Sequence, residues 1–147
     1  MVAFLLIDDK VVRIESMQKQ QHYLTELALV SFGGGIGGSL RYLLHFVPGI
    51  GPLPVMTMMI NWSGTFLLAC LGAYLAQRAS RLASWQTFIG TGVIGGYTTF
   101  STMILQYFQL TTTALVWAVG YLLLTIVGGL IFLRFGRWCG RRLGGVQ

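Results

Sequence analysis

Near the middle of an uncharged hydrophobic segment the chain reads Gly95-Gly96-Tyr97-Thr98-Thr99-Phe100-Ser101-Thr102. Glycine and β-branched threonine are poor helix formers, so this stretch predicts an interruption in a helix of about residues 84–110. Inside a membrane, such an interruption is tolerated only where protein or a water-filled cavity covers the freed backbone groups. We therefore expect a membrane span that is broken midway and whose backbone polar groups do not face lipid.

The composition of the whole chain indicates a membrane protein. Hydrophobic residues make up 54% of the 147 residues and charged residues only 10%, whereas a soluble domain carries about 25% charged residues. Three further apolar stretches are long enough to cross a bilayer, which takes about 20 residues. The predicted fold is an all-α membrane protein of four transmembrane helices, the third broken mid-span, with spans at about residues 23–47, 55–77, 84–110 and 114–133.

Residues 1–20 differ from the rest because they are rich in charged side chains. Their apolar run, residues 2–7, is too short to span a bilayer and lacks the preceding basic segment of a signal peptide. We expect a flexible or surface-lying extension over residues 1–20, followed by a four-helix unit over residues 21–147. Met17 is an alternative start of translation.

The basic residues predict the orientation of the chain in the membrane. The net charge is +6, but the basic residues are spread over the chain ends and one loop, which argues against nucleic-acid binding. Four spans put both termini and the middle loop on one side, and the side with more arginine and lysine is cytoplasmic. Arg41 alone lies on the other side, so both termini are predicted to be cytoplasmic; the basic residues on their side are Lys10, Arg13, Lys19, Arg78, Arg81, Arg134, Arg137, Arg141 and Arg142.

No catalytic constellation is present in the sequence, so we predict that the chain is not an enzyme. His22 and His45 have no acidic or cysteine partner at the spacing of a metal site or a catalytic triad. Cys70 and Cys139 are interpreted as small hydrophobic residues. Proton-coupled carriers keep ionisable groups within their spans, and the later spans have none, which favours a passive pathway lined by neutral groups.

The stretch at residues 95–102 resembles the central motif of the Fluc (CrcB) fluoride channel family. The glycine-rich residues 33–42, which end in Arg-Tyr, are similar to the first helix of that family. Residues 61–66 resemble its second-helix Asn-x-x-Gly-x-Phe pattern, and Tyr121 and Thr125 are similar to polar residues of its fourth helix. Together the pieces cover about residues 27–135 in the family's order.

The resemblance implies an antiparallel, dual-topology dimer that exports fluoride passively through two narrow pores and so lowers cytoplasmic fluoride. A structural sodium ion, which is not transported, would be held at the dimer centre by the main-chain carbonyls of Gly95 and Thr98. Arg41 is expected in a structural or gating role. The pore-lining residues carried over from the family are Asn61, Phe100, Ser101, Thr102, Met103, Tyr121 and Thr125.

The chain departs from the family pattern at two positions. Met103 stands where a second phenylalanine is usual, and Gln106 where a glutamate is frequent. A subunit that inserts in both orientations should have similar numbers of arginine and lysine residues on the two sides of the membrane. In this chain nearly all of them are on one side. We therefore hypothesise that it pairs with an oppositely oriented homologous subunit, which supplies one working pore.

The physical chemistry of these residue types agrees with the resemblance. Sodium is a hard cation that suits backbone oxygens, as at the unwound helices of transporters. Fluoride is small and strongly hydrated, so neutral amide and hydroxyl donors can replace its water without trapping it. The positive edge of a phenylalanine ring can also face an anion.

Plainer interpretations remain open for the same residues. Asn61 can simply bond a neighbouring helix, Phe100 can be packing, and Arg41 can anchor the chain at the interface. The hydroxyls of Thr102 and Thr125 can bond carbonyls of their own helices.

For the chain as a whole, the alternative is a small multidrug-type exporter or scaffold without a fluoride role. Such an exporter would need a proton-coupling carboxylate, for which Glu26 is the sole candidate.

Overall fold

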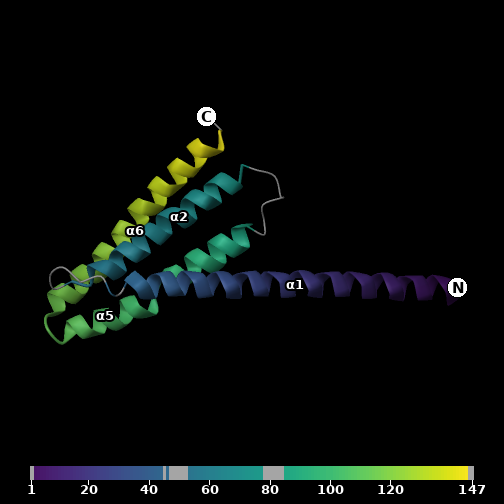
Figure 1. Cartoon of the computed structure of the whole chain (residues 1–147), viewed down its shortest axis with the longest axis horizontal. Coiled ribbons are helices and arrows are strands. Elements are labelled where there is room, and N and C mark those ends of the chain that lie inside the picture. The colour runs from purple at the N-terminus through teal and green to yellow at the C-terminus, as the bar shows by residue number, and fades with distance from the viewer. Residues whose placement is uncertain (1, 45, 47–52, 78–84, 146–147) are drawn as a thin grey trace.

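The computed structural model describes residues 2–44, 46, 53–77 and 85–145, with side chains from residue 13 onward. All regular structure in these ranges is helical (Figure 1). The elements are α1 (Val2–Leu44), α2 (Val55–Leu75), η2 (Gln86–Ile94), α4 (Gly95–Tyr97), α5 (Ser101–Thr111) and α6 (Leu115–Gly144). His45 and the loop that carries Arg78 and Arg81 lie outside the described residues.

Four helices are long and apolar enough to cross a membrane: Arg13–Leu44, Val55–Leu75, Gln86–Thr111 and Leu115–Gly144. In the most apolar window of each, at most 28% of the residues are buried inside the chain. Large apolar side chains such as Val116 and Phe32 therefore point outward, which is stable only if lipid or another protein replaces water. The prediction of an all-α, multi-pass membrane chain with four spans is confirmed.

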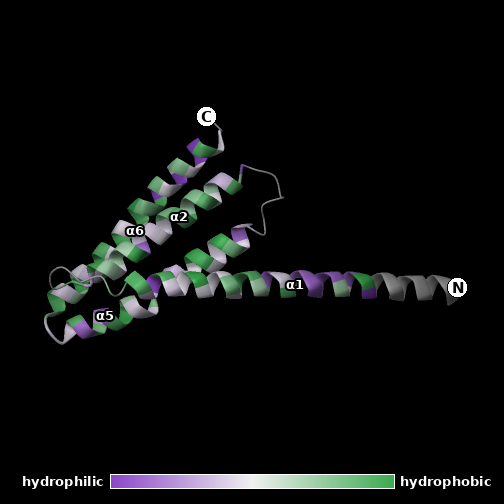
Figure 2. Ribbon diagram, in the orientation of Figure 1, coloured by the Kyte–Doolittle hydropathy of each residue, from purple (hydrophilic) through white to green (hydrophobic). Residues whose placement is uncertain are grey.

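Helix α1 runs without interruption through the predicted extension and the first span. Its 43 residues carry it well beyond the other helices toward the N-terminus (Figure 1). Figure 2 shows a hydrophilic stretch midway along α1, between two more hydrophobic parts. The boundary expected at residue 20 is therefore marked by composition and not by a change of secondary structure, and the flexibility of the extension stays a prediction.

The helices pack in two groups, and one buried cluster joins α2, α5 and α6. Helix α2 lies along α6, α1 crosses η2 and α4, and α5 packs against α6 (Figure 1). Met58, Met103 and Tyr121, from α2, α5 and α6, form the buried apolar cluster. This arrangement brings the middle of the third span between α1 and α2.

Glycines allow the crossing of α1 with the third span. A Cβ on Gly33 would lie 2.7 Å from the carbonyl oxygen of Phe88, and one on Gly37 would overlap the carbonyl of Val93. Small residues of this kind let helix backbones approach closely inside a membrane, where packing holds helices together.

The third span is bent. Residues 86–94 are wound as a π-helix, α4 ends at Tyr97, and Thr98 is extended with ψ of 157°. The helix resumes at Ser101. π-helical turns often occur at functional sites. The bend is therefore the first place in the chain to look for a binding site.

We predict that Gly37→Ala destabilises the folded chain by about 1–3 kcal/mol, because the added methyl group overlaps the backbone of the third span. The measurement is the thermal unfolding midpoint in detergent. Gly38→Ala is the matched control, since no atom lies within 4 Å of a Cβ there. Equal midpoints for the two variants would contradict the close approach.

Candidate functional site

Asn61 of α2 is bound to the bend of the third span by two hydrogen bonds. Its Nδ2 donates to the carbonyl of Thr99 at 3.0 Å, and the Thr99 N–H donates to its Oδ1 at 2.9 Å. An amide side chain matches a backbone peptide in this way because each carries one donor beside one acceptor. The pair thus fixes a non-helical segment onto α2.

The hydroxyl of Thr99 starts the helix that follows. It accepts a hydrogen bond from the N–H of Thr102 at 3.2 Å and donates to the Thr102 hydroxyl at 3.0 Å. This is the chemistry of a helix cap, in which a side-chain oxygen satisfies one of the N–H groups left free at the first turn. Thr99 is buried, and the pattern of a threonine three residues before another hydroxyl is the sequence signal that would have singled it out.

The carbonyl of Gly95 is released from the usual helical hydrogen bond. In a continuous α-helix it would accept from the N–H of Thr99, but that N–H is bonded to Asn61. Among the described residues, the side chain that donates to the Gly95 carbonyl is Thr98, whose hydroxyl lies at the long distance of 3.5 Å. Gly95 is exposed, and a Cβ there would meet nothing closer than the Gly90 oxygen at 3.9 Å, so the backbone at Gly95 adjoins open space.

The sequence predicts that the main-chain carbonyls of Gly95 and Thr98 bind a cation. The described residues contain no group of three or more histidine, cysteine, aspartate or glutamate side chains that could hold a metal. Oxygens are the ligands that hard cations prefer; Gly95 begins α4, and Thr98 follows its last residue. The assignment of sodium to them stays a prediction.

Asn61, Thr98 and Phe100 line one small pocket of about 230 Å³, called here the Asn61 pocket. Phe100 is 73% exposed, so most of its side chain is not covered by the described residues. The other residues that line this pocket are Gly64, Thr65, Leu68 and Thr99. Three of the residues predicted from the sequence are therefore brought together.

Other predicted residues lie elsewhere. Thr102 and Arg41 line a second pocket, of about 640 Å³, on the α1 side of the bend. Ser101 is exposed at the start of α5, with its Oγ 3.4 Å from the Thr99 hydroxyl. The hydroxyl groups of the motif are thus divided between the two sides of the third span.

Met103 and Tyr121 are packed in the buried cluster and do not line either pocket. The Tyr121 hydroxyl donates to Oε1 of Gln106 at 3.0 Å. Thr125 donates to the carbonyl of Tyr121 at 2.7 Å, within its own helix. Their contact with a pore stays a prediction, and the plainer interpretation of Thr125 describes its hydroxyl in this structure.

Trp62, next to Asn61, links α2 to α6. Its Nε1 donates to the carbonyl of Thr125 at 2.9 Å, and its ring stacks on Phe132 with centroids 5.7 Å apart. This role could not be predicted from the sequence, because a tryptophan in an apolar span has no characteristic spacing. It holds the Asn61 turn of α2 at a fixed distance from α6.

Residues 28–137, three quarters of the chain, match the family model described as "CrcB-like protein, Camphor Resistance (CrcB)". The chain belongs to the CrcB family. The family resemblance inferred from the motifs is therefore confirmed, and the matched range contains Arg41 and every residue of the Asn61 pocket.

Several CrcB relatives are named as ion channels. The chain is 39% identical to the fluoride-specific ion channel FluC 2 of Listeria monocytogenes over 111 residues, 75% of this chain and 86% of the relative. It is 38% identical to FluC 2 of Ligilactobacillus salivarius over 132 residues, 88% and 96% of the two chains. It is also 38% identical to FluC of Mesorhizobium japonicum over 121 residues, 80% and 97%. These names confirm that the CrcB chain is not an enzyme.

We predict that Asn61→Leu lowers the stability of this CrcB chain by about 2 kcal/mol or more. Leucine keeps the volume, but it leaves the N–H and carbonyl of Thr99 without partners in a half-buried site. Denaturant unfolding in detergent measures the effect.

Thr65→Val is the matched control on the same helix, because the Thr65 hydroxyl bonds only the carbonyl of Asn61 in its own helix. A loss below about 1 kcal/mol is expected for it. Equal losses in the two variants would mean that the bridge to Thr99 contributes nothing.

Proposed function

We propose that this chain is a subunit of a fluoride-specific channel that lets fluoride leave the cytoplasm passively. The observation that carries the proposal is the Asn61 pocket, where neutral donors and the exposed ring of Phe100 meet at an interrupted span. The names of the CrcB relatives supply the identity of the ion.

The donors in the pocket suit a small anion. The Asn61 amide has two N–H groups, and the bond to Thr99 uses only one of them. The other can donate to fluoride while the amide remains fixed. Together with the positive edge of the Phe100 ring, it replaces part of the hydration shell without a fixed charge that would hold the ion.

The sequence of the second and third spans supports passive transport. In the described parts of the second and third spans, residues 55–77 and 86–111, the sequence has no Asp, Glu, Lys or Arg. A proton-coupled carrier would need such a group within the membrane. Fluoride would therefore move down its own electrochemical gradient.

We further propose that the carbonyls of Gly95 and Thr98 hold a structural sodium ion. The fit rests on the Gly95 carbonyl, which is released by the Asn61–Thr99 pair and lies at an exposed glycine. Two carbonyls from one chain leave a cation under-coordinated, so the same groups of a second chain would complete the site. When bound, the ion supplies a positive charge that holds the two chains together.

The second chain of this proposal is an oppositely oriented homologous subunit. The arginines of α6 favour a cytoplasmic C-terminus for this chain, and a partner of the reverse orientation would bring its own bend to the exposed Phe100. Met103 packs against Met58 and Tyr121 within the chain, so the second aromatic edge of a complete pore would come from the partner.

The proposal is tested by fluoride efflux from liposomes. We expect slow efflux from the chain alone and fast, chloride-independent efflux when an oppositely oriented homologue is co-reconstituted. Asn61→Ala should slow the efflux about tenfold or more, because a donor to the ion is lost.

Glu26→Gln is the matched control, because Glu26 is the carboxylate that a proton-coupled exporter would need. Its side chain is 48% exposed and lies 3.8 Å from His22 on the polar part of α1, so we expect unchanged efflux. A defect in the Glu26 variant with none in Asn61→Ala would overturn the channel in favour of an exporter. Full conduction by the lone chain would remove the requirement for a partner.

Sodium is expected to raise the thermal midpoint of the conducting assembly above that in a large organic cation, since a ligand that binds only the folded state stabilises it. Asn61→Leu should lose this sodium response, because the hydrogen bonds that hold the bend and its Gly95 carbonyl in place are removed. Identical midpoints of the wild type in both cations would contradict the sodium site.

A further inference from the structure

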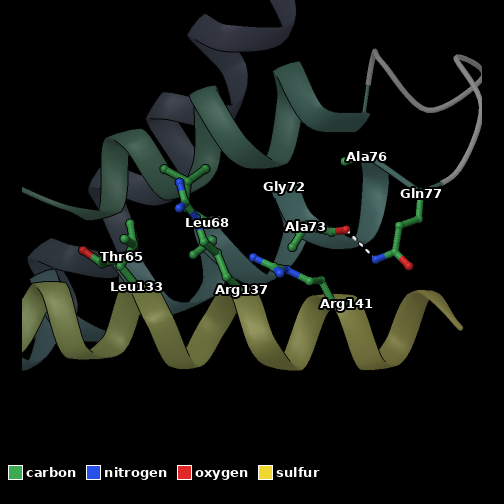
Figure 3. Close-up of a pocket in the computed structure, with 10 residues that line it drawn as sticks. Thr65, Leu68, Gly72, Ala73, Ala76, Gln77, Leu133, Arg137 and Arg141 are labelled. Atoms are coloured by element: carbon green, nitrogen blue, oxygen red, sulfur yellow. Dashed lines mark hydrogen bonds between the residues drawn. The ribbon is translucent and has the colours of Figure 1, made fainter. Parts of the chain in front are cut away.

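A large hollow lies between α2 and α6, away from the bend. Figure 3 shows this cavity of about 680 Å³, called here the arginine pocket. Arg137 and Arg141 extend from α6 toward α2 across it (Figure 3). The remaining residues that line it are Thr65, Leu68, Ala69, Gly72, Ala73, Ala76, Gln77 and Leu133.

The two arginines have no anionic partner in the described chain. The ion pair recorded there joins His22 to Glu26, both on α1. Every acidic residue of the sequence lies at or before position 26, far along the chain from α6. Arg142, by contrast, is held over the ring of Trp138 at 4.8 Å. Arg137 and Arg141 are exposed and therefore leave a positive potential in the pocket with nothing to neutralise it.

The far end of the pocket is closed by a fixed polar side chain. Gln77 donates from Nε2 to the carbonyl of Ala73 at 2.8 Å and to that of Gly140, on α6, at 3.4 Å (Figure 3). It thereby bridges α2 and α6 at their ends. The small side chains on this face of α2 keep the space beside the arginines open.

The arginine pocket adjoins the Asn61 pocket. Thr65 and Leu68 line both of them. From Asn61 to Ala76 the lining residues follow one face of α2, a path of about 22 Å at 1.5 Å per residue. A small ion in the arginine pocket therefore reaches Asn61 along a single helix face.

We propose that the arginine pocket is an entrance that collects anions and passes them to Asn61. This inference rests on the proposed function and adds to it the place and the residues at which fluoride enters. Positive clefts with low-dielectric walls raise the local concentration and the arrival rate of an anion by about 10–1,000-fold. Because both guanidinium groups are exposed, they attract the ion without stripping its water, and dehydration is left to the Asn61 pocket.

The test compares two double variants of α6 in fluoride efflux from liposomes of neutral phosphatidylcholine, with the partner chain if the conducting assembly contains one. Arg137→Gln with Arg141→Gln removes the charge from the pocket. Arg134→Gln with Arg142→Gln removes the same charge from the same helix end, at residues that do not line the pocket.

At about 10 mM salt, where charges act over about 30 Å, we expect the pocket variant to be about three- to tenfold slower than the wild type. At about 150 mM salt, where the range falls to about 8 Å, the difference should shrink. The control variant should stay within about twofold of the wild type at both salt concentrations.

Wild-type efflux from the pocket variant at low salt would overturn the entrance. So would an equal defect in the control variant, which would assign the effect to the helix end as a whole. A defect confined to vesicles with anionic phosphatidylglycerol would assign the arginines to a lipid phosphate instead. Absence of fluoride efflux from the wild-type assembly in every arm would contradict the proposed function and, with it, the entrance.

Discussion

The paired hydrogen bonds between Asn61 and Thr99 are the constraint on which the rest of the structure depends. A membrane offers no water to satisfy a peptide group that leaves its helix. Asn61 supplies the missing donor and acceptor from the neighbouring helix at 3.0 and 2.9 Å. Asn61 binds the N–H of Thr99, so the carbonyl of Gly95 loses its usual helical partner. The single amide of Asn61 therefore accounts for two features of the bend, the side-chain pair with Thr99 and the free Gly95 carbonyl.

The surrounding packing holds that amide in place. Trp62 ties the same turn of α2 to α6, and the glycines of α1 let the third span approach on the other side. The Thr99 hydroxyl starts α5 directly after the bend. The bend is therefore held by contacts from α1, α2 and α5, which keep its polar groups ordered.

The sequence predicted what depends on residue type and missed what depends on packing. The spans follow from hydrophobic length, and the bend follows from the low helix propensity of residues 95–102. The bond of Asn61 to Thr99 and the bond of Trp62 to Thr125 were missed, because they join residues 38 and 63 positions apart. The burial of Met103 against Tyr121 was equally invisible, since the pattern of α5 alone does not tell which neighbour covers a side chain.

A high-resolution crystal structure of the conducting assembly, grown in sodium and fluoride, tests the central claim most directly. The account predicts the Asn61 amide bonded to both backbone groups of Thr99, with the Gly95 carbonyl turned out of the helix and an ion beside the free N–H of Asn61. An unbroken helix through residues 95–101, with the Thr99 N–H bonded to Gly95 and Asn61 away from any cavity, would contradict it.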